Sequence, residues 1–268
     1  MRKKFKFGII GAGFMSSAII KGVLRSKTLC PEDIIVSDIN INSLDKLLSL
    51  GVSTTTDNKF LADNSEFVLF AIKPQNLDDV LEKIKECSCQ KFISIMAGVK
   101  ISKIKNNFSN VKVARCMPNT PCSISSGAVG LDLSDYTDSN DIEFIESIFN
   151  SFATVCFVEE KDINVVTGVS GSSPAYFYLF LQGIIDAGVK LGLDKNVAKK
   201  LATSTMIGAG KMILENEDKS IDELINAVCS KGGTTIEAVN TYKNCKLSDI
   251  TEKAVIACVK RSIELENL

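Results

Sequence analysis

The chain has 268 residues, of which 45% are hydrophobic and 24% are charged, a composition typical of a globular protein with one large domain or two modest ones. Its 31 Lys and Arg residues nearly balance 32 Asp and Glu residues, which argues against nucleic acid or an anionic membrane as the main partner. The chain contains no histidine, which excludes mechanisms that need a histidine base or a histidine metal ligand, such as those of Ser-His-Asp hydrolases and zincins.

Short β-branched runs alternate with amphipathic stretches through the first 160 or so residues. We expect strands at Phe5–Ile10, Ile34–Ser37, Phe67–Ile72, Phe92–Met96, Val111–Met117 and Val155–Val158. We expect helices at Met15–Ser26, Asn42–Leu50, Leu77–Cys87, Ser102–Asn107 and Asp141–Phe152. This alternation predicts right-handed crossovers and a mostly parallel sheet.

After Asp162 the strand signal disappears and only helical periodicity continues. Helices are expected at Pro174–Leu191, Asn196–Asn216, Ile221–Val228, Thr234–Tyr242 and Asp249–Leu265. The sequence therefore predicts an α/β domain over residues 1–160 and an all-helical domain over residues 161–268.

A glycine-rich turn lies between the first expected strand and the first expected helix. Gly11 permits a tight turn, and Gly13 lets the backbone approach a pyrophosphate at the helix N-terminus. Ser16 replaces the third glycine of this pattern with another small residue. A purely structural glycine turn is the alternative, but the position favours a Rossmann-type dinucleotide-binding domain.

Asp38 follows the second expected strand, where an acidic residue bonds the adenine ribose hydroxyls. A carboxylate there should repel a 2′-phosphate, which favours NADH. The backbone N–H groups of Ser37–Asn40 could still hold a phosphate, so the choice between NADH and NADPH stays open.

Three further loops follow expected strands: Ala71–Gln75, Ser94–Val99 and Arg115–Pro121. Each could be a rigid chain reversal. Because open α/β sheets bind ligands at the carboxyl ends of their strands, the three together favour a ligand crevice.

Gly232 and Gly233 precede Thr234 and Thr235 at the start of an expected helix. Free N–H groups at a helix N-terminus suit a carboxylate, and a threonine hydroxyl can donate or accept a hydrogen bond. From these residues alone, a plain N-cap threonine after a glycine turn is the favoured interpretation.

Four motifs in this order and spacing resemble those of the pyrroline-5-carboxylate reductases, which make proline by reducing a cyclic imine. They are Ala71–Gln75, Met117–Pro121, Val166–Tyr176 and Ser230–Thr235, and the similarity runs essentially end to end. Ser173 stands where the family usually has glycine, which we expect to alter local packing only. Lys231 stands where the family usually has proline, and its ammonium could change the affinity for a carboxylate.

The resemblance implies a set of site residues. On the cofactor side they are Gly11, Ala12, Gly13, Phe14 and Met15 at the pyrophosphate, Asp38 and Asn58 near the adenosine half, and Ala71, Ile72, Lys73, Pro74, Met96, Ala97 and Gly98 along the nicotinamide side. On the substrate side they are Ser230, Gly232, Gly233, Thr234 and Thr235. The backbone of Gly233–Thr235 would hold the substrate carboxylate, and the Thr235 hydroxyl would contact the ring nitrogen. Glu217 falls near an acidic position that the family places beside the substrate. That Glu217 is only a solvated charge at a helix end is an equally valid interpretation.

Imine reduction is consistent with a chain that lacks histidine, because a protonated imine is already electrophilic and needs orientation more than acid–base chemistry. Lys73 is the obvious candidate for a catalytic cation, but we keep it as a cofactor-loop residue. Two alternatives remain, a β-hydroxyacid dehydrogenase and a non-catalytic dinucleotide-binding regulator. The Gly-Gly-Thr-Thr loop argues against the first, and the intact cofactor turn with Ser230 and Thr235 argues against the second.

The remaining expectations concern assembly and location. Apolar residues cover much of the helix at Pro174–Leu191, which predicts a partner subunit and at least a homodimer. The nine cysteines are scattered without a C-x-x-C pair, so we expect no metal site but free, mostly buried thiols in a reducing cytosol. Because Met1–Phe7 lead into a strand without an apolar signal core, we expect a cytoplasmic protein.

Overall fold

A computed structural model describes residues 4–266 of the chain. The chain forms two compact units, the first comprising the residues up to Pro174 together with those from Ala257 onward, and the second Ala175–Ile256. The C-terminal end of the last helix therefore belongs to the same unit as the N-terminal sheet.

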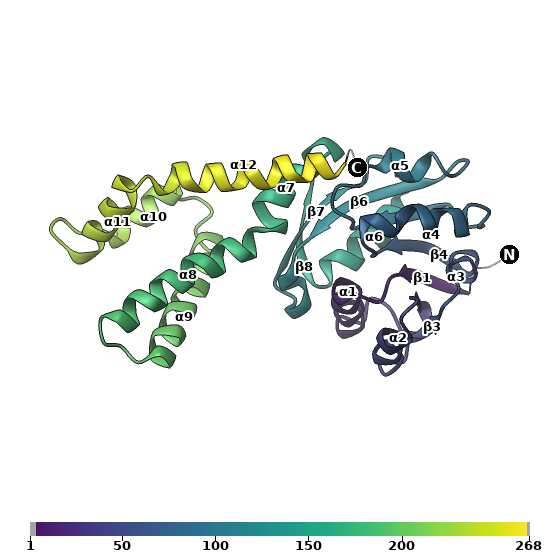
Figure 1. Ribbon diagram of the computed structural model, residues 1–268, viewed down its shortest axis with the longest axis horizontal. Coiled ribbons are helices and arrows are strands. Elements are labelled where there is room, and N and C mark those ends of the chain that lie inside the picture. The colour runs from purple at the N-terminus through teal and green to yellow at the C-terminus, as the bar shows by residue number, and fades with distance from the viewer. Residues whose placement is uncertain (1–3, 267–268) are drawn as a thin grey trace. The chain divides into compact units, whose positions relative to one another are not determined.

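In the described part of the first unit, eight strands form one sheet in the order β3-β2-β1-β4-β5-β6-β7-β8 (Figure 1). The strands are β1 (Phe5–Ile10), β2 (Ile34–Ser37), β3 (Ser53–Thr55), β4 (Ser65–Phe70), β5 (Lys91–Ser94), β6 (Lys112–Pro118), β7 (Gly127–Asp132) and β8 (Ala153–Phe157). Neighbouring strands are parallel except β6 and β7. The expected mostly parallel sheet is confirmed.

Successive strand residues point to opposite faces of this sheet, so both faces are apolar, and helices cover each of them. One core contains Phe7 and Ile9 with residues of α1 (Phe14–Arg25), α2 (Ile41–Leu48) and α6 (Ser139–Asn150). The other contains Phe5 and Ile10 with residues of α3 (Asn58–Asn64), α4 (Leu77–Ile84) and α5 (Ile101–Lys105). The unit also contains α7 (Ile163–Val166), which a π-helical turn at Thr167–Gly171 extends.

The sequence pattern missed β3, α3, β7 and α7. In β7, Gly127 and Gly130 break the β-branched signal, and packing explains Gly130, because a Cβ there would lie 2.6 Å from Val166 Cγ1. The strand expected at Phe67–Ile72 instead spans Ser65–Phe70. Ala71 and Ile72 therefore lie in the loop after β4.

The helices of the C-terminal part are α8 (Ser173–Lys190), α9 (Lys195–Leu214), α10 (Ile221–Val228), α11 (Thr234–Asn244) and α12 (Leu247–Leu265). Between residues 175 and 256, all of which the structure describes, only Ile185 and Ala198 are buried. Phe177 and Leu179 on α8 have 57% and 77% of their surface exposed. The second unit thus leaves large apolar side chains uncovered by its own chain. Among residues 4–266, no helix is both long and apolar enough to span a bilayer.

The cysteines are less buried than expected. Cys89, Cys116 and Cys122 are buried, whereas Cys30, Cys156 and Cys245 are exposed and the other three are intermediate. The expectation of mostly buried thiols is wrong, because exposed cysteines lie in a loop, on the edge strand β8 and at the end of α11. All nine are free thiols.

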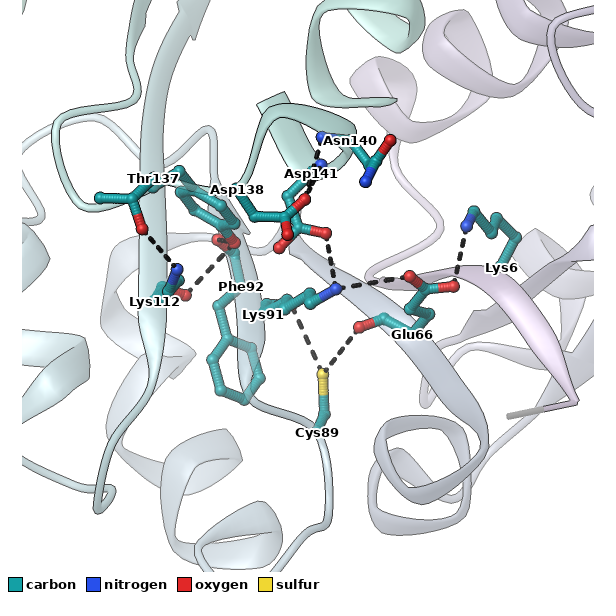
Figure 2. A network of polar contacts seen from close by, with 11 residues as sticks. Lys6, Glu66, Cys89, Lys91, Phe92, Lys112, Thr137, Asp138, Asn140 and Asp141 are labelled. Atoms are coloured by element: carbon teal, nitrogen blue, oxygen red, sulfur yellow. Dashed lines mark hydrogen bonds and ion pairs between the residues drawn. The ribbon is translucent and has the colours of Figure 1, made fainter. Parts of the chain in front are cut away.

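The amino ends of the strands carry an ion network (Figure 2). Lys91 Nζ lies 2.6 Å from Asp141 Oδ1 and 3.4 Å from Glu66 Oε1, and Lys6 Nζ lies 2.9 Å from Glu66 Oε2. Burial raises the pKa of Glu66, but hydrogen bonds and charge from Lys6 and Lys91 outweigh it and bring the net pKa below its usual value. This network joins β1, β4, β5 and α6 at the sheet edge opposite the candidate site.

Candidate active site

The glycine turn after β1 is built around one close backbone approach. Gly11 has a φ of +107°, and a Cβ there would lie 2.6 Å from the Ala71 carbonyl oxygen. Its N–H donates to the Ser37 carbonyl at 2.7 Å, and the Ala71 N–H donates to the Ile10 carbonyl at 2.9 Å. These bonds bring the loops after β1, β2 and β4 to one point at the carboxyl edge of the sheet.

Helix α1 begins at this point with its N-terminus open. Gly13 is the N-cap, and among residues 4–266 no side chain caps the helix and no acidic residue occupies its first turn. A Cβ on Gly13 would meet no described heavy atom within 4 Å. Ser16 is buried and its hydroxyl donates to the Gly11 carbonyl at 2.5 Å. The open N–H groups, the positive helix end and the free space above Gly13 fit a pyrophosphate.

Asp38 and Asn58 lie at the ends of the loops next to this turn. The Asp38 carboxylate accepts hydrogen bonds from the Ala12 N–H at 2.7 Å and from the Asn40 N–H at 2.8 Å. Asn58 Oδ1 accepts from the Ser37 hydroxyl at 2.7 Å. The two predicted adenosine-side residues are thus tied to the β1 and β2 turns.

The predicted nicotinamide-side residues lie on the loops after β4 and β5. Ala71 and Ile72 are half-buried, Lys73 is exposed, and Pro74 begins a short 3₁₀ turn before α4. Met96 is buried, and its N–H donates to Ser94 Oγ at 3.3 Å. Ala97 is half-buried, and Gly98 is buried with a φ of +68°. All the cofactor-side candidates therefore come from one edge of one sheet.

In the third segment, Arg115–Pro121, the residues up to Pro118 belong to β6, and only the last three follow the strand. The Arg115 side chain is only 1% exposed and pairs with Glu160 at 3.2 Å and Glu266 at 2.8 Å. Asn119 Oδ1 accepts from the Ala128 N–H at 3.0 Å. The sequence analysis missed Glu160 and Glu266, because no local motif relates either residue to Arg115.

The substrate-side candidates belong to the second unit. Gly232 has a φ of +71°, and the Gly233 N–H donates to the Ser230 carbonyl at 3.0 Å, which closes a tight turn before α11. The N-cap is Gly233, and no side chain of the described residues caps the helix. Thr234 and Thr235 are both exposed. The interpretation of an N-cap threonine is therefore wrong, because the glycine takes that position and leaves the Thr235 hydroxyl available.

The remaining residues are Glu217 and the two departures from the family pattern, Lys231 and Ser173. Glu217 is exposed in the turn between α9 and α10, and within residues 4–266 its side chain makes neither a hydrogen bond nor an ion pair. Lys231 is exposed in the Ser230–Gly233 turn. Ser173 is buried, and its hydroxyl donates to the Ser170 carbonyl at 3.4 Å.

The Val166–Tyr176 motif borders a pocket in the first unit. This pocket has a volume of about 380 Å³ and is lined mainly by apolar residues of β7, β8 and the α7 region, among them Gly130, Cys156, Val165 and Val169. Across residues 4–266, no three Cys, Asp or Glu side chains are grouped so that they could hold a metal ion.

Comparison with known proteins identifies the family of this chain. A family model described as pyrroline-5-carboxylate reductase dimerisation matches residues 160–265, and one described as NADP oxidoreductase, coenzyme F420-dependent, matches residues 6–98. The pyrroline-5-carboxylate reductase of Pasteurella multocida is 35% identical over 97% of both chains. A solved pyrroline-5-carboxylate reductase structure from Coxiella burnetii has 33% identity and a TM-score of 0.90 over 98% of this chain and 99% of its own.

A second solved structure is that of the Plasmodium falciparum pyrroline carboxylate reductase with NADP bound. It is 28% identical, with a TM-score of 0.87 over 99% of this chain and 100% of its own. Relatives above 30% identity over nearly the full length of both chains establish the relationship. The chain belongs to the pyrroline-5-carboxylate reductase family.

Proposed function

We propose that this chain reduces 1-pyrroline-5-carboxylate to L-proline, the last step of proline biosynthesis, with NAD(P)H as hydride donor. The observation that carries the proposal is the family relationship over 97% of the chain, which includes every motif of the candidate site. The β-hydroxyacid dehydrogenase and the non-catalytic regulator are correspondingly disfavoured.

The cofactor side follows from the fit of the α1 N-terminus to a pyrophosphate. Backbone N–H groups of Gly13, Phe14 and Met15 would bind it, since no side chain of the described residues caps this helix. Asp38 and Asn58 would face the adenosine half, and the Ala71–Pro74 and Met96–Gly98 loops would line the nicotinamide half. When bound, NAD(P)H supplies the hydride that reduces the imine carbon.

The substrate side follows from the open N-terminus of α11. The N–H groups of Gly233–Thr235 would hold the substrate carboxylate, assisted by the positive end of the helix. The Thr235 hydroxyl oxygen would accept a hydrogen bond from the protonated ring nitrogen and hold the imine carbon toward the nicotinamide. Ser230 closes the turn that presents these groups, and Glu217 would lie near the substrate.

The exposed apolar residues of α8 support a homodimer. Phe177 and Leu179 would be covered by a second copy of the second unit, within the segment that the dimerisation family model matches. We propose residues 1–160 as the cofactor domain, residues 161–268 as the substrate and dimerisation domain, and the cytoplasm as the location.

Product analysis tests this function. Purified protein is incubated with pyrroline-5-carboxylate and either NADPH or NADH, and the product is separated by chiral chromatography. We expect L-proline to form in equal amounts to the oxidised cofactor. Cofactor binding without proline formation would contradict the proposal.

A further inference from the structure

The C-terminal end of α12 lies directly on the loop after β5. A Cβ built on Gly98 would lie 2.6 Å from Leu265 Cβ and 3.2 Å from the Leu265 carbonyl carbon. Because Gly98 also has a φ of +68°, only glycine fits both the backbone conformation and the space. The backbone of the cofactor loop and that of the C-terminal segment are therefore in van der Waals contact.

Glu266 adds an ionic attachment beside this contact. Its side chain is 6% exposed, with Oε1 2.8 Å from Arg115 Nη2 and Oε2 3.6 Å from Lys100 Nζ. Lys100 is the N-cap of α5, two residues after Gly98, and Arg115 is paired in register with Ser94, the last residue of β5. One carboxylate thus reaches cations on both sides of the Met96–Gly98 loop.

The same arginine is held from its other side by Glu160. Glu160 Oε1 lies 3.2 Å from Arg115 Nη1 and also accepts from the Ile101 N–H at 2.6 Å, at the start of α5. Asn164 contributes a further contact, since its Oδ1 lies 2.7 Å from the Ser262 hydroxyl on α12. These bonds attach the start of α5, which follows the Met96–Gly98 loop, and the last turns of α12 to the polar groups around Arg115.

The ion cluster around Arg115 fixes the positions of the groups that it joins more than it stabilises the fold. Burying an ion pair costs desolvation energy that offsets much of the attraction, so it contributes little net stability, whereas it fixes the atoms that it joins. Burial raises the pKa of Glu266, but hydrogen bonds and charge from Arg115, Asn164 and Lys100 outweigh it, so the carboxylate is ionised at neutral pH.

We infer that Glu266 is a positioning residue for the cofactor: through Arg115 and Lys100 it fixes the Met96–Gly98 backbone at the carboxyl end of β5, where the nicotinamide half binds. The inference rests on the proposed function for the identity of the cofactor. Glu266 itself is 151 residues from Arg115 in the chain and belongs to none of the motifs that identify the family.

Equilibrium binding of NADPH and of NADH, each added alone and followed by calorimetry, tests this inference with Glu266→Gln. The neutral amide cannot hold Arg115 and Lys100 as firmly, so the loop should relax. We expect the Kd for both cofactors to rise about tenfold, less than the ~100-fold that a full 1 Å displacement of a reacting group can cost. In turnover assays the KM for the cofactor should rise similarly, while the KM for the imine stays within about twofold.

Glu264→Gln is the matched control. Glu264 lies two residues earlier on α12, is 61% exposed and pairs only with Arg261 among the ion pairs of residues 4–266, so its variant should bind both cofactors as the wild type does. A folded Glu266→Gln protein with the wild-type Kd for both cofactors would overturn the inference. An equal rise in both KM values would also overturn it, since that result indicates a general loss of structure.

Glu266→Asp covers the case in which Glu266→Gln does not fold. It keeps the charge beside Arg115 but shortens the reach, and we expect the Kd to rise about threefold. An unchanged Kd would again overturn the inference. Binding is measured without imine, so the two claims can fail separately. A weaker Kd in the variant of a protein that makes no proline would support the inference and contradict the proposed function. Normal proline formation with an unchanged Kd in the variant would support the proposed function and contradict the inference.

Discussion

The Asp38 carboxylate accepts a hydrogen bond from the Ala12 N–H at 2.7 Å, across 26 residues of sequence. With the second bond from the Asn40 N–H at 2.8 Å, this fixes a negative charge beside the glycine turn. The residue therefore holds the turn together and, in a dinucleotide site, sets the charge that faces the adenosine half.

Removing that charge should shift the cofactor preference. For Asp38→Asn we expect the ratio of kcat/KM with NADPH to kcat/KM with NADH to rise about tenfold, because ~1.4 kcal/mol of repulsion toward a 2′-phosphate is lost. Steady-state rates with each cofactor measure the ratio. Asp45→Asn, an exposed acid on α2, is the control, and an unchanged ratio in Asp38→Asn would show that the carboxylate does not face the ribose.

Substitutions at Gly11 and Gly13 test separately the packing of the glycine turn and its binding of the cofactor. Gly11→Ala places a Cβ 2.6 Å from the Ala71 carbonyl at a φ of +107°, so we expect Tm to fall by about 5 °C, since such strain costs roughly 1–3 kcal/mol. In Gly13→Ala the new Cβ meets no described atom within 4 Å, so its Tm should fall by less than that of Gly11→Ala, by the loss of a glycine N-cap alone, while the Kd for NAD(P)H rises. Thermal melts and calorimetry check both, and a Gly13→Ala protein with normal cofactor affinity would contradict a pyrophosphate at that helix end.

The ion network around Glu66 predicts a specific acid sensitivity. Its pKa in the folded protein lies below the ordinary value of 4.5, so the stabilisation is fully present above that value and is lost as the pH falls through the folded pKa. Glu66→Gln should therefore show a smaller loss of the free energy of unfolding as the pH falls below 4.5, measured by urea titration. Glu143→Gln, on the exposed side of α6, should retain the wild-type slope, and equal slopes in all three proteins would contradict the role of the network.

The exposed face of α8 should hold the dimer together. Leu179 is 77% exposed in the single chain, and Leu179→Asp would place a charge in the proposed interface, so we expect a monomer by light scattering. Leu48→Asp, at a 55% exposed leucine of α2, is the control and should leave the dimer intact. A dimeric Leu179→Asp protein would place the interface elsewhere.

Local pattern predicts much of the fold but not its long-range contacts. The strand at Phe5–Ile10 and the helix at Ile221–Val228 agree with their expected bounds, because Phe and Ile dominate the first segment and an apolar helical period runs through the second. The Gly11 turn was found from spacing alone. β7 was missed because Gly127 and Gly130 serve close packing, which is visible only once their neighbours are in place.

The ion pairs of Arg115 also could not be predicted from local sequence pattern. In sequence, Arg115 begins a segment that was expected to border a ligand crevice, yet its partners Glu160 and Glu266 lie 45 and 151 residues away. No local period relates these positions, and the return of α12 to the first unit is what joins them. Whether Thr234 caps α11 likewise depended on one backbone geometry, in which Gly233 takes the cap position.

The rate of NAD(P)H oxidation with pyrroline-5-carboxylate, compared between wild type and Thr235→Ala, tests the central claim most directly. We expect rapid wild-type turnover and a loss of kcat/KM of about 100-fold in the variant, because the hydrogen bond that orients the imine is gone. Thr241→Ala, in the same helix with its hydroxyl bonded to the Glu237 carbonyl, should retain wild-type turnover. Equal turnover in wild type and Thr235→Ala would contradict the assigned site, and no turnover by a wild-type protein that binds NAD(P)H would contradict the reaction itself.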